Sequence, residues 1–383
     1  MRNYQWVDDA LEQGYYPILS LRCYQVSYTE GTRRTLTRYS AGDISSQYID
    51  MDSIHAEWAY SPSDIFEPGG CIPVSLSFKL LPGSGLSLET VINPTSAADY
   101  SYVYYPIVTF KHYKINTSYF ATPFPYMILR EQTKVKGDIQ AKRLYFEDET
   151  CMFDYVDIDV ASYSGQLFSQ LIWHLLNTCG LADSQNSGIV GGVSLVGTNY
   201  YDGEPMSGRQ LLSYIGETNG VFFIMNSNSM LKIAEMLDAE KDGDTYVHDM
   251  DLSWQYYVSH STGEIWPSTY PWRRVLVFAY GAERRTGNFP DTYILYDNPF
   301  VNENNTLTYY NLLRERLIKT LQYSCTEVEY RFDPRLEIGD FVGVYYRVEN
   351  LVLGNPITIC RIVWDGSAFC TIKSPEFTRY NRI

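Results

Sequence analysis

Short runs of strand-forming residues recur along the whole chain, separated by turns rich in Gly, Pro and Asn. The run from Val74 to Leu80 alternates apolar and polar side chains, a pattern that buries one face of a strand and wets the other. Similar runs occupy residues 18–28, 107–115, 126–130, 156–160, 274–280, 342–348 and 357–364. Their density predicts β-barrels or β-sandwiches.

Helical periodicity is confined to residues 164–179, 207–219 and 306–322. The second of these segments carries a capping box, because Ser207 can accept from the first free N–H groups while Gln210 reaches back. Gly220 is placed to end that helix. The residues that follow, 221–233, predict two strands joined by a turn of Asn and Ser residues.

Trp173 departs from the pattern of the first predicted helix. At about 100° per residue the apolar side chains form one face, and Trp173 points to the opposite side beside polar residues. Either a neighbouring part of the same chain covers this ring, or it anchors a contact between subunits. Trp173 is therefore the candidate interface residue.

The elements together predict a mainly β fold with an α+β insert. We expect two barrel-like or sandwich-like domains, residues 1–155 and 241–383, to flank a small helical domain with a hairpin at 156–240. The helix at 306–322 is expected to connect two strand-rich regions of the chain. A chain of 383 residues is long enough for two or three such domains.

Composition adds two observations to this picture. Tyrosine occurs 35 times, which suits either surfaces buried on assembly or half-exposed strands, where its β-propensity is high. The net charge is −15, which argues against a surface that grips nucleic acid through its phosphates. An acidic wall would still allow DNA to pass through a channel without sticking.

The seven cysteines have none of the spacings of a zinc site, and we expect them to be buried free thiols made in a reducing cytoplasm. The N-terminal residues contain two acids and no apolar core, so we expect no signal peptide. No apolar run reaches the length of a transmembrane helix.

Acidic residues cluster between positions 147 and 159 and raise the question of a glycan hydrolase. The cluster comprises Glu147, Asp148, Glu149, Asp154, Asp157 and Asp159. A hydrolase needs two carboxylates held several ångströms apart across a sugar, and the sequence cannot supply that distance. Solvated acids on strand ends and turns explain the cluster better. Because nucleophile elbows and metal-binding histidine motifs are also missing from the sequence, we expect no catalytic residues, no cofactor and no enzymatic activity.

Residues 238–249 imitate a calcium-binding loop, with acidic residues at alternate positions and a Gly for the turn. The preceding residues read as a strand, the eighth position is Thr245, and the last ligand would be Asp249 rather than the longer Glu. A solvated acidic turn is the preferred interpretation, and we expect no metal site.

Four segments together resemble the hub proteins of bacteriophage and prophage tail tips, the hub region of tail-associated lysins and prophage tail endopeptidases. They are residues 207–233, the Asn-Pro step at 297–300, the segment Pro334 to Asp340 followed by an apolar run, and the passage from 146–154 into the first helix. In the third segment Gly339 permits a turn and Asp340 can accept from nearby N–H groups, so we interpret it as a structural entry to the last barrel. Their order and spacing cover residues 45–375.

This resemblance implies a structural component of the virion tail tip, made in the cytoplasm of the bacterial host. Such hubs form a homotrimeric ring that joins the tail tube protein, distal tail protein and tape-measure protein to tail fibres or receptor-binding proteins. The ring gates the channel through which genomic DNA is ejected after host attachment. Only residues 378–383 follow the final strand, so we expect any cell-wall enzyme to be a separate protein. A glycan-binding adhesin and the spike-bearing hub of a contractile injection system remain as alternatives.

Overall fold

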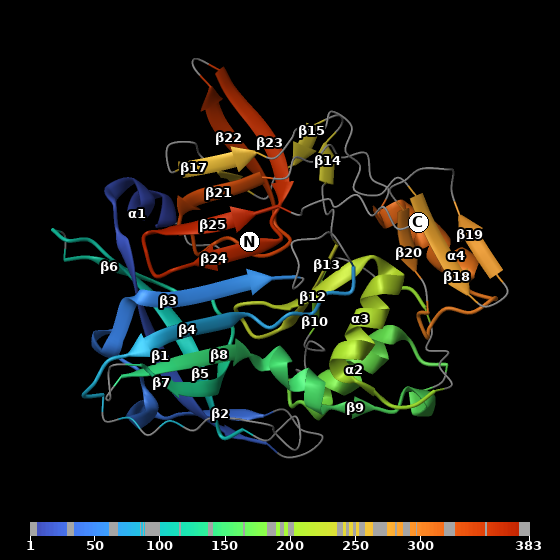
Figure 1. The fold of residues 1–383 in the computed structure, drawn as a ribbon, viewed down its shortest axis with the longest axis horizontal. Helices are drawn as coiled ribbons and strands as arrows, with labels where there is room; N and C mark the ends of the chain where they lie inside the picture. Colours follow the sequence, from blue (N-terminus) through green and yellow to red (C-terminus); the bar gives the residue numbers. More distant parts are fainter. Residues whose placement is uncertain are drawn as a thin grey trace.

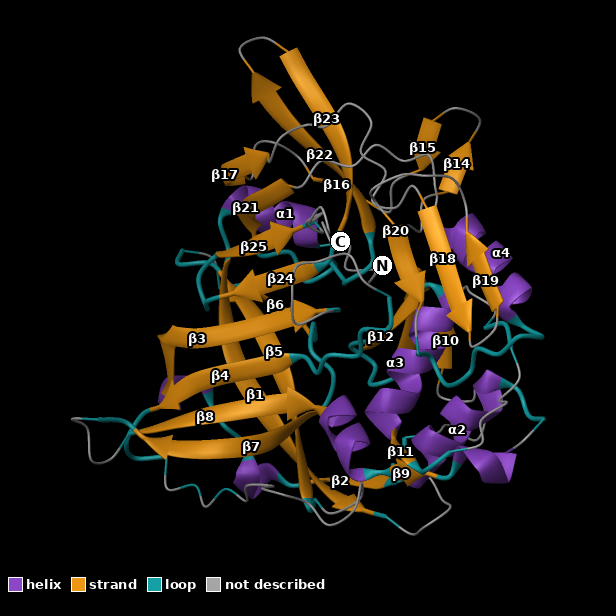
Figure 2. Ribbon diagram, turned by 45° about the vertical axis from the view of Figure 1, so that its right-hand side comes forward, coloured by secondary structure: helices purple, strands orange, loops and turns teal. Residues whose placement is uncertain are grey.

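The computed structural model describes residues 6–28, 34–60, 68–84, 86, 88, 100–114, 116–136, 141–163, 165–181, 189–191, 195–197, 203–235, 240–242, 245–247, 250–252, 257–262, 274–279, 282–285, 292–295, 297–317, 326–348 and 351–374. This part of the chain is mainly β, and one large sheet dominates it (Figure 1). The helices at 168–178, 208–219 and 306–317 lie to one side of that sheet, and the helix at 7–13 lies apart from them (Figure 2).

The N-terminal third supplies most strands of the large sheet. Its strands are β1 (Tyr16–Ser27), β2 (Thr35–Arg38), β3 (Ile49–Ala59), β4 (Ser75–Leu80), β5 (Tyr102–Lys111), β6 (Ser118–Ala121), β7 (Met127–Lys134) and β8 (Lys142–Asp148). They lie in the order β3-β4-β8-β7-β5-β1-β2, with β6 paired to β5. In β4, Leu76, Phe78 and Leu80 are buried and the residues between them are half-buried, which confirms the predicted alternation.

The C-terminal region continues the same sheet. Its strands are β17 (Tyr257–Thr262), β21 (Thr326–Arg331), β24 (Arg361–Trp364) and β25 (Phe369–Lys373). Antiparallel pairing of β24 with β3, from Ala59 with Arg361 to Ala56 with Trp364, joins the first and last thirds of the chain. At the same corner α1 (Val7–Gln13) is tied to the C-terminal region by an ion pair of 2.8 Å between Asp8 and Arg335.

The expectation of barrels is therefore corrected in one respect. Within the described residues no strand order closes on itself, and the large antiparallel sheet runs as an open path from β17 to β2. Backbone pairing across the two ends of the chain produces this sheet, and a residue pattern along one segment cannot reveal it. The division at residues 155 and 240 stays a prediction.

The insert contains the helices α2 (Phe168–Thr178) and α3 (Gly208–Asn219). The 3-10 helix η3 (Glu149–Tyr155) leads into the insert, whose other elements are the 3-10 helix η4 (Val160–Tyr163) and the strands β9 (Asp157–Ile158), β10 (Ile189–Gly191), β11 (Met206–Ser207), β12 (Val221–Met225) and β13 (Leu231–Glu235). The predicted capping box of Ser207 and Gln210 is present, and Gly220 ends α3 in the left-handed conformation with φ of 65°. The predicted hairpin of β12 and β13 is also confirmed.

The strand expected at 156–160 is wrong in its length. Only the two residues of β9 pair, and the chain then enters η4. The Asp159 carbonyl accepts from the Ser162 N–H at 3.3 Å, and the two side chains bond as well. Short polar side chains that bond to their own neighbours in this way compete with a strand ladder. The first helix likewise begins at Phe168 rather than at 164, after Gly165 with φ of 82°.

The remaining elements are smaller and include α4 (Thr306–Leu317), with 3-10 turns η1 (Ser40–Gly42) and η2 (Ser46–Tyr48). Residues 318–322 of the helix predicted at 306–322 lie outside the described part. The other strands are β14 (Glu240–Asp242), β15 (Thr245–Val247), β16 (Met250–Leu252), β18 (Arg274–Ala279), β19 (Ala282–Arg285), β20 (Thr292–Leu295), β22 (Phe341–Val348) and β23 (Leu351–Thr358). Among the described helices none is long and apolar enough to cross a membrane.

One hydrophobic core connects the sheet to the insert. The rings of Phe332, just after β21, and Trp364 of β24 stack with their centroids 4.5 Å apart. The centroid of the Phe124 ring, from the N-terminal third, lies 4.5 Å from that of Trp58. Six cysteines, at 23, 71, 151, 179, 360 and 370, are buried free thiols, as predicted. Cys325 lies outside the described residues.

Candidate functional site

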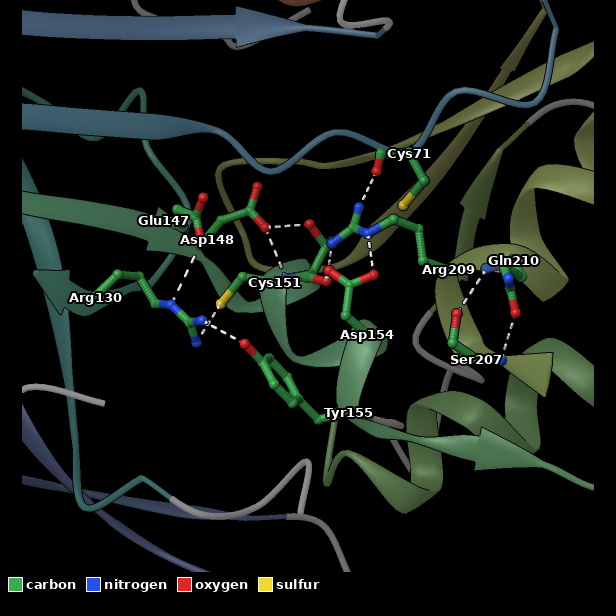
Figure 3. Close-up of polar contacts among 11 residues, drawn as sticks. Cys71, Arg130, Glu147, Asp148, Cys151, Asp154, Tyr155, Ser207, Arg209 and Gln210 are labelled. Atoms are coloured by element: carbon green, nitrogen blue, oxygen red, sulfur yellow. Dashed lines mark hydrogen bonds and ion pairs between the residues drawn. The ribbon is translucent and has the colours of Figure 1, made fainter. Parts of the chain in front are cut away.

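A polar joint connects the large sheet to the helical insert where β8 ends. We use this name for the carboxylates Glu147, Asp148, Glu149 and Asp154 and the arginines Arg34, Arg130 and Arg209. The acids belong to the end of β8 and to η3, whereas the arginines come from three other parts of the chain. Figure 3 shows the contacts of Arg130 and Arg209 around η3.

Asp148 fixes the turn from β8 into η3. Its carboxylate accepts from the Thr150 backbone N–H and hydroxyl, at 2.7 and 2.6 Å, and from the Val74 N–H at 2.7 Å. The side chain is fully buried, and burial raises the pKa of Asp148 from 3.8 to about 6 despite these hydrogen bonds. Asp148 therefore caps η3 and holds the start of β4 with one carboxylate.

Glu149 forms a buried ion pair with Arg34. The guanidinium Nη2 donates to the carboxylate Oε2 at 2.6 Å, and Nη1 donates to the Tyr100 hydroxyl at 3.0 Å. The Glu149 side chain is fully buried, and that of Arg34 is 7% exposed. Since Arg34 directly precedes β2, the pair ties an edge of the sheet to η3.

Arg209 reaches from the first turn of α3 into the joint. Its Nε pairs with the Asp154 carboxylate at 2.6 Å, and its Nη2 donates to the Thr150 carbonyl at 2.9 Å. A further bond goes to the Cys71 carbonyl, in the segment before β4. One guanidinium thus binds α3, η3 and the sheet together (Figure 3).

Arg130 holds η3 from the side of β7. Its Nη2 donates to the Tyr155 hydroxyl at 2.9 Å, and its Nε lies 3.5 Å from the Glu147 carboxylate. The guanidinium also lies over the Tyr155 ring, 5.4 Å from its centroid. Both ends of η3 are therefore held by arginines.

This geometry corrects the interpretation of the acidic cluster as solvated. Asp148 and Glu149 are fully buried, because the first caps a helix and the second neutralises a buried arginine. Asp154, Asp157 and Asp159 are exposed. Buried, bonded carboxylates cannot flank a sugar as hydrolysis requires. What the joint does is hold several chain segments in one arrangement.

Trp173, the predicted interface residue, lies on α2 with 44% of its surface exposed. Leu171, Ile172, Leu175 and Leu176 on the same helix are buried, so the predicted orientation of the ring is correct. Beside it, the His174 Nε2 and the Tyr163 hydroxyl lie 2.7 Å apart and join α2 to η4. Whether another subunit covers Trp173 stays a prediction.

The segment 334–340 forms a second joint, between the β12–β13 hairpin and β22. Gly339 has φ of 87°, and Asp340 accepts from the Glu337 N–H at 2.8 Å, both as predicted. Asp340 lies 3.8 Å from the Lys232 ammonium of β13, and burial raises its pKa from 3.8 to about 6. The Asn-Pro step at 297–300 is anchored in a similar way, because the Asn298 amide donates to the Tyr214 carbonyl of α3 at 3.0 Å.

The calcium-like segment 238–249 falls largely outside the described residues. Its strands β14 and β15 pair as a hairpin, with Asp242 opposite Thr245. Within the residues whose side chains are described, no group of three or more His, Cys, Asp or Glu is placed to hold a metal ion.

No pattern in the sequence indicated that Arg34, Arg130 and Arg209 would meet in the polar joint. Arg34 and Glu149 are 115 positions apart, and Arg209 and Cys71 are 138 apart. No local pattern links residues over such distances. The one local signal in this region is Asp148 itself. Asp is a preferred N-cap residue, and its carboxylate can accept from the backbone N–H two positions later, here that of Thr150.

No protein-family model matches the sequence, and no curated protein matches it. Among solved structures, the tail protein from Neisseria meningitidis MC58 matches with a TM-score of 0.55 and 12% identity, over 96% of this chain and 98% of that chain. The 43 kDa tail protein of prophage MuSo2 from Shewanella oneidensis matches with a TM-score of 0.49 and 12% identity, over 93% and 96%. The prophage tail protein gp18 from Listeria monocytogenes EGD-e matches with a TM-score of 0.40 and 10% identity, over 94% and 95%. The Neisseria match shows that the two chains share a fold.

Proposed function

We propose that this protein is a structural component of a phage or prophage tail, a hub subunit at the tip. The observation that carries the proposal is the fold shared with the Neisseria tail protein over 96% of this chain and 98% of the other. A match of that extent spans nearly the whole of both chains. The four sequence segments that resemble tail-tip hubs support the same assignment independently.

The role is mechanical rather than catalytic. In the described part of the chain, the buried acids hold neighbouring elements together instead of facing an open cleft. A subunit that keeps its shape under load needs such connections between its sheet and its insert. We propose that three copies form a ring around the DNA channel and contact the tail tube, distal tail and tape-measure proteins on one side. Tail fibres or receptor-binding proteins attach on the other side.

Light scattering on isolated tail tips tests the copy number. We expect a mass that corresponds to three copies of this chain, while the protein expressed alone is a monomer. Antibody labelling of intact tails in the electron microscope tests the position, and the expected label lies at the tip. A native dimer or tetramer, or label along the tail shaft, would rule out the proposed ring.

A further inference from the structure

Exposed aromatic side chains form a patch on the solvent face of β1, β5 and β6. Tyr16, Tyr113 and Phe120 are 42, 73 and 61% exposed. The strand register pairs Thr109 with Ile18 on one side and with Phe120 on the other, so Ile18, Thr109 and Phe120 form one row across the sheet. Tyr16 lies two positions before Ile18 on the same face of β1, and Tyr113 follows the end of β5. We call Tyr16, Ile18, Tyr113 and Phe120 the aromatic patch.

A groove adjoins the aromatic patch. It has a volume of about 460 Å³ and is lined by Tyr16 and Ile18 of the patch, by Met51 near the start of β3 and by the turn at 366–368. Exposed aromatic rings beside an apolar groove are the features of a surface that is buried on assembly.

Two of the four patch residues, Tyr113 and Phe120, lie in a segment without acids. Residues 100–130 contain no Asp or Glu, although the chain as a whole carries a net charge of −15. Lys111 and Lys114 are exposed at the turn between β5 and β6. The β5–β6 side of the patch therefore combines exposed aromatic rings with two lysines on an acidic protein.

A second surface has the opposite charge. Residues 144–208 contain nine acids and no Lys or Arg; Asp148 and Glu149 are buried in the polar joint, whereas Asp154, Asp157 and Asp159 are exposed. In this stretch Trp173 is 44% exposed on α2, and Asp157 and Asp159 are exposed on and just after β9. We call Trp173, Asp157 and Asp159 the acidic face. Figure 1 shows β6 at the left edge of the molecule and α2 with β9 toward the lower right, so the two surfaces belong to separate sides of the described structure.

We propose that the aromatic patch of one copy docks on the acidic face of the next copy. This inference rests on the proposed function and names the surfaces that would close its ring. A cyclic ring needs two different surfaces on each subunit, on separate sides of the chain. Aromatic anchors provide the energy of such contacts, and opposite charges at the rim fix the orientation.

Photo-cross-linking in isolated tail tips tests this contact. A photoreactive phenylalanine analogue replaces Phe120, and in a control it replaces Leu307, which is 50% exposed on α4. We expect the analogue at position 120 to link two copies of this chain, with the acceptor peptide within residues 157–178. Cross-links to a different protein, or to another part of this chain, would overturn the contact.

A charge exchange provides the second test. Lys111→Asp with Lys114→Asp should weaken ring formation about tenfold, and so should Asp157→Lys with Asp159→Lys, because like charges then meet at the rim. Combining the four substitutions should restore the ring. If the combined protein has an unchanged melting temperature but does not recover, the proposed contact is wrong. Tail tips with three copies and no cross-link would refute this contact and leave the proposed function standing, whereas a different copy number would refute the ring.

Discussion

At the residue scale, the main finding is that charged side chains in the joints are buried with partners. Glu149 and Arg34 are both removed from water, and each neutralises the other. Burying an ion pair contributes little net stability, but removing one partner leaves an uncompensated charge. We therefore expect this ion pair to favour one arrangement of β2 and η3 over others more than it raises the total free energy of unfolding.

The first prediction concerns this ion pair. Glu149→Gln should lower the free energy of unfolding by about 3–5 kcal/mol, because the Arg34 charge stays buried without a partner. Glu327→Gln is the matched control, since Glu327 is 50% exposed and pairs with Lys373 at 2.9 Å. That substitution should cost about 1 kcal/mol or less. Urea unfolding measures the free energy of unfolding of both variants. Equal losses would contradict the inference that the Glu149–Arg34 pair is buried and the Glu327–Lys373 pair is exposed.

The second prediction uses the raised pKa of Asp340, about 6 instead of 3.8. Because the folded protein holds this proton more tightly than the unfolded chain, the contribution of Asp340 to stability is greatest below pH 4 and is lost as the pH rises through 6. Asp340→Asn removes the titration. The unfolding free energy of the wild type relative to this variant should rise by up to about 3 kcal/mol from pH 7 to pH 4. A difference that stays constant with pH would show that Asp340 titrates normally.

At the element scale, the connections matter as much as the helices and strands. The capped helix α3, its Gly220 stop and the following hairpin were readable from local sequence, because caps and turns are made by neighbouring residues. The strand expected at 156–160 was not, since Asp159 and Ser162 bond locally and divert the chain into η4.

The third prediction tests the turn before β22. Gly339→Val should lower the folding stability by about 1–3 kcal/mol through backbone strain. A Cβ at this position would also lie 3.2 Å from the Phe222 ring and 3.3 Å from the Ala234 Cβ. Gly83→Val is the control, because Gly83 has φ of 93° but open space around it, and it should cost less. Thermal unfolding measures both variants, and we expect the lower melting temperature for Gly339→Val.

A specific result would reverse the interpretation of this turn. If the Gly339→Val protein keeps its melting temperature but no longer attaches to the tail tube, the segment 334–340 is a contact site. Its role as scaffold would then be wrong.

At the scale of the whole molecule, the large sheet joins the two ends of the chain. β3 pairs with β24, and the aromatic side chains of both regions share one core. The polar joint then attaches the insert to this sheet. The described molecule is thus connected by long-range contacts, as the proposed structural role requires.

The fourth prediction is that the protein does not cleave cell-wall or capsular glycans. Incubation with host peptidoglycan and capsular polysaccharide should release no fragments, because Asp148 and Glu149 are buried in the joint. The measurement is chromatography of the soluble products. Release that disappears in Asp148→Asn or Asp154→Asn would show that the acidic cluster is catalytic.

The sequence by itself determined the mainly β character, the helices α2, α3 and α4, the caps of α3, the hairpin after it, the buried thiols and the outward direction of Trp173, but it did not reveal α1 or the start of α2. Each of these depends on residues within a few positions of one another or on a simple periodicity. Only the tertiary structure decided that one open sheet unites both ends of the chain, and that Arg34, Arg130 and Arg209 converge on η3. The physical reason is distance along the chain. The pairing of β3 with β24 and the Arg34–Glu149 ion pair join residues more than a hundred positions apart, and their energy depends on a geometry that exists only after folding.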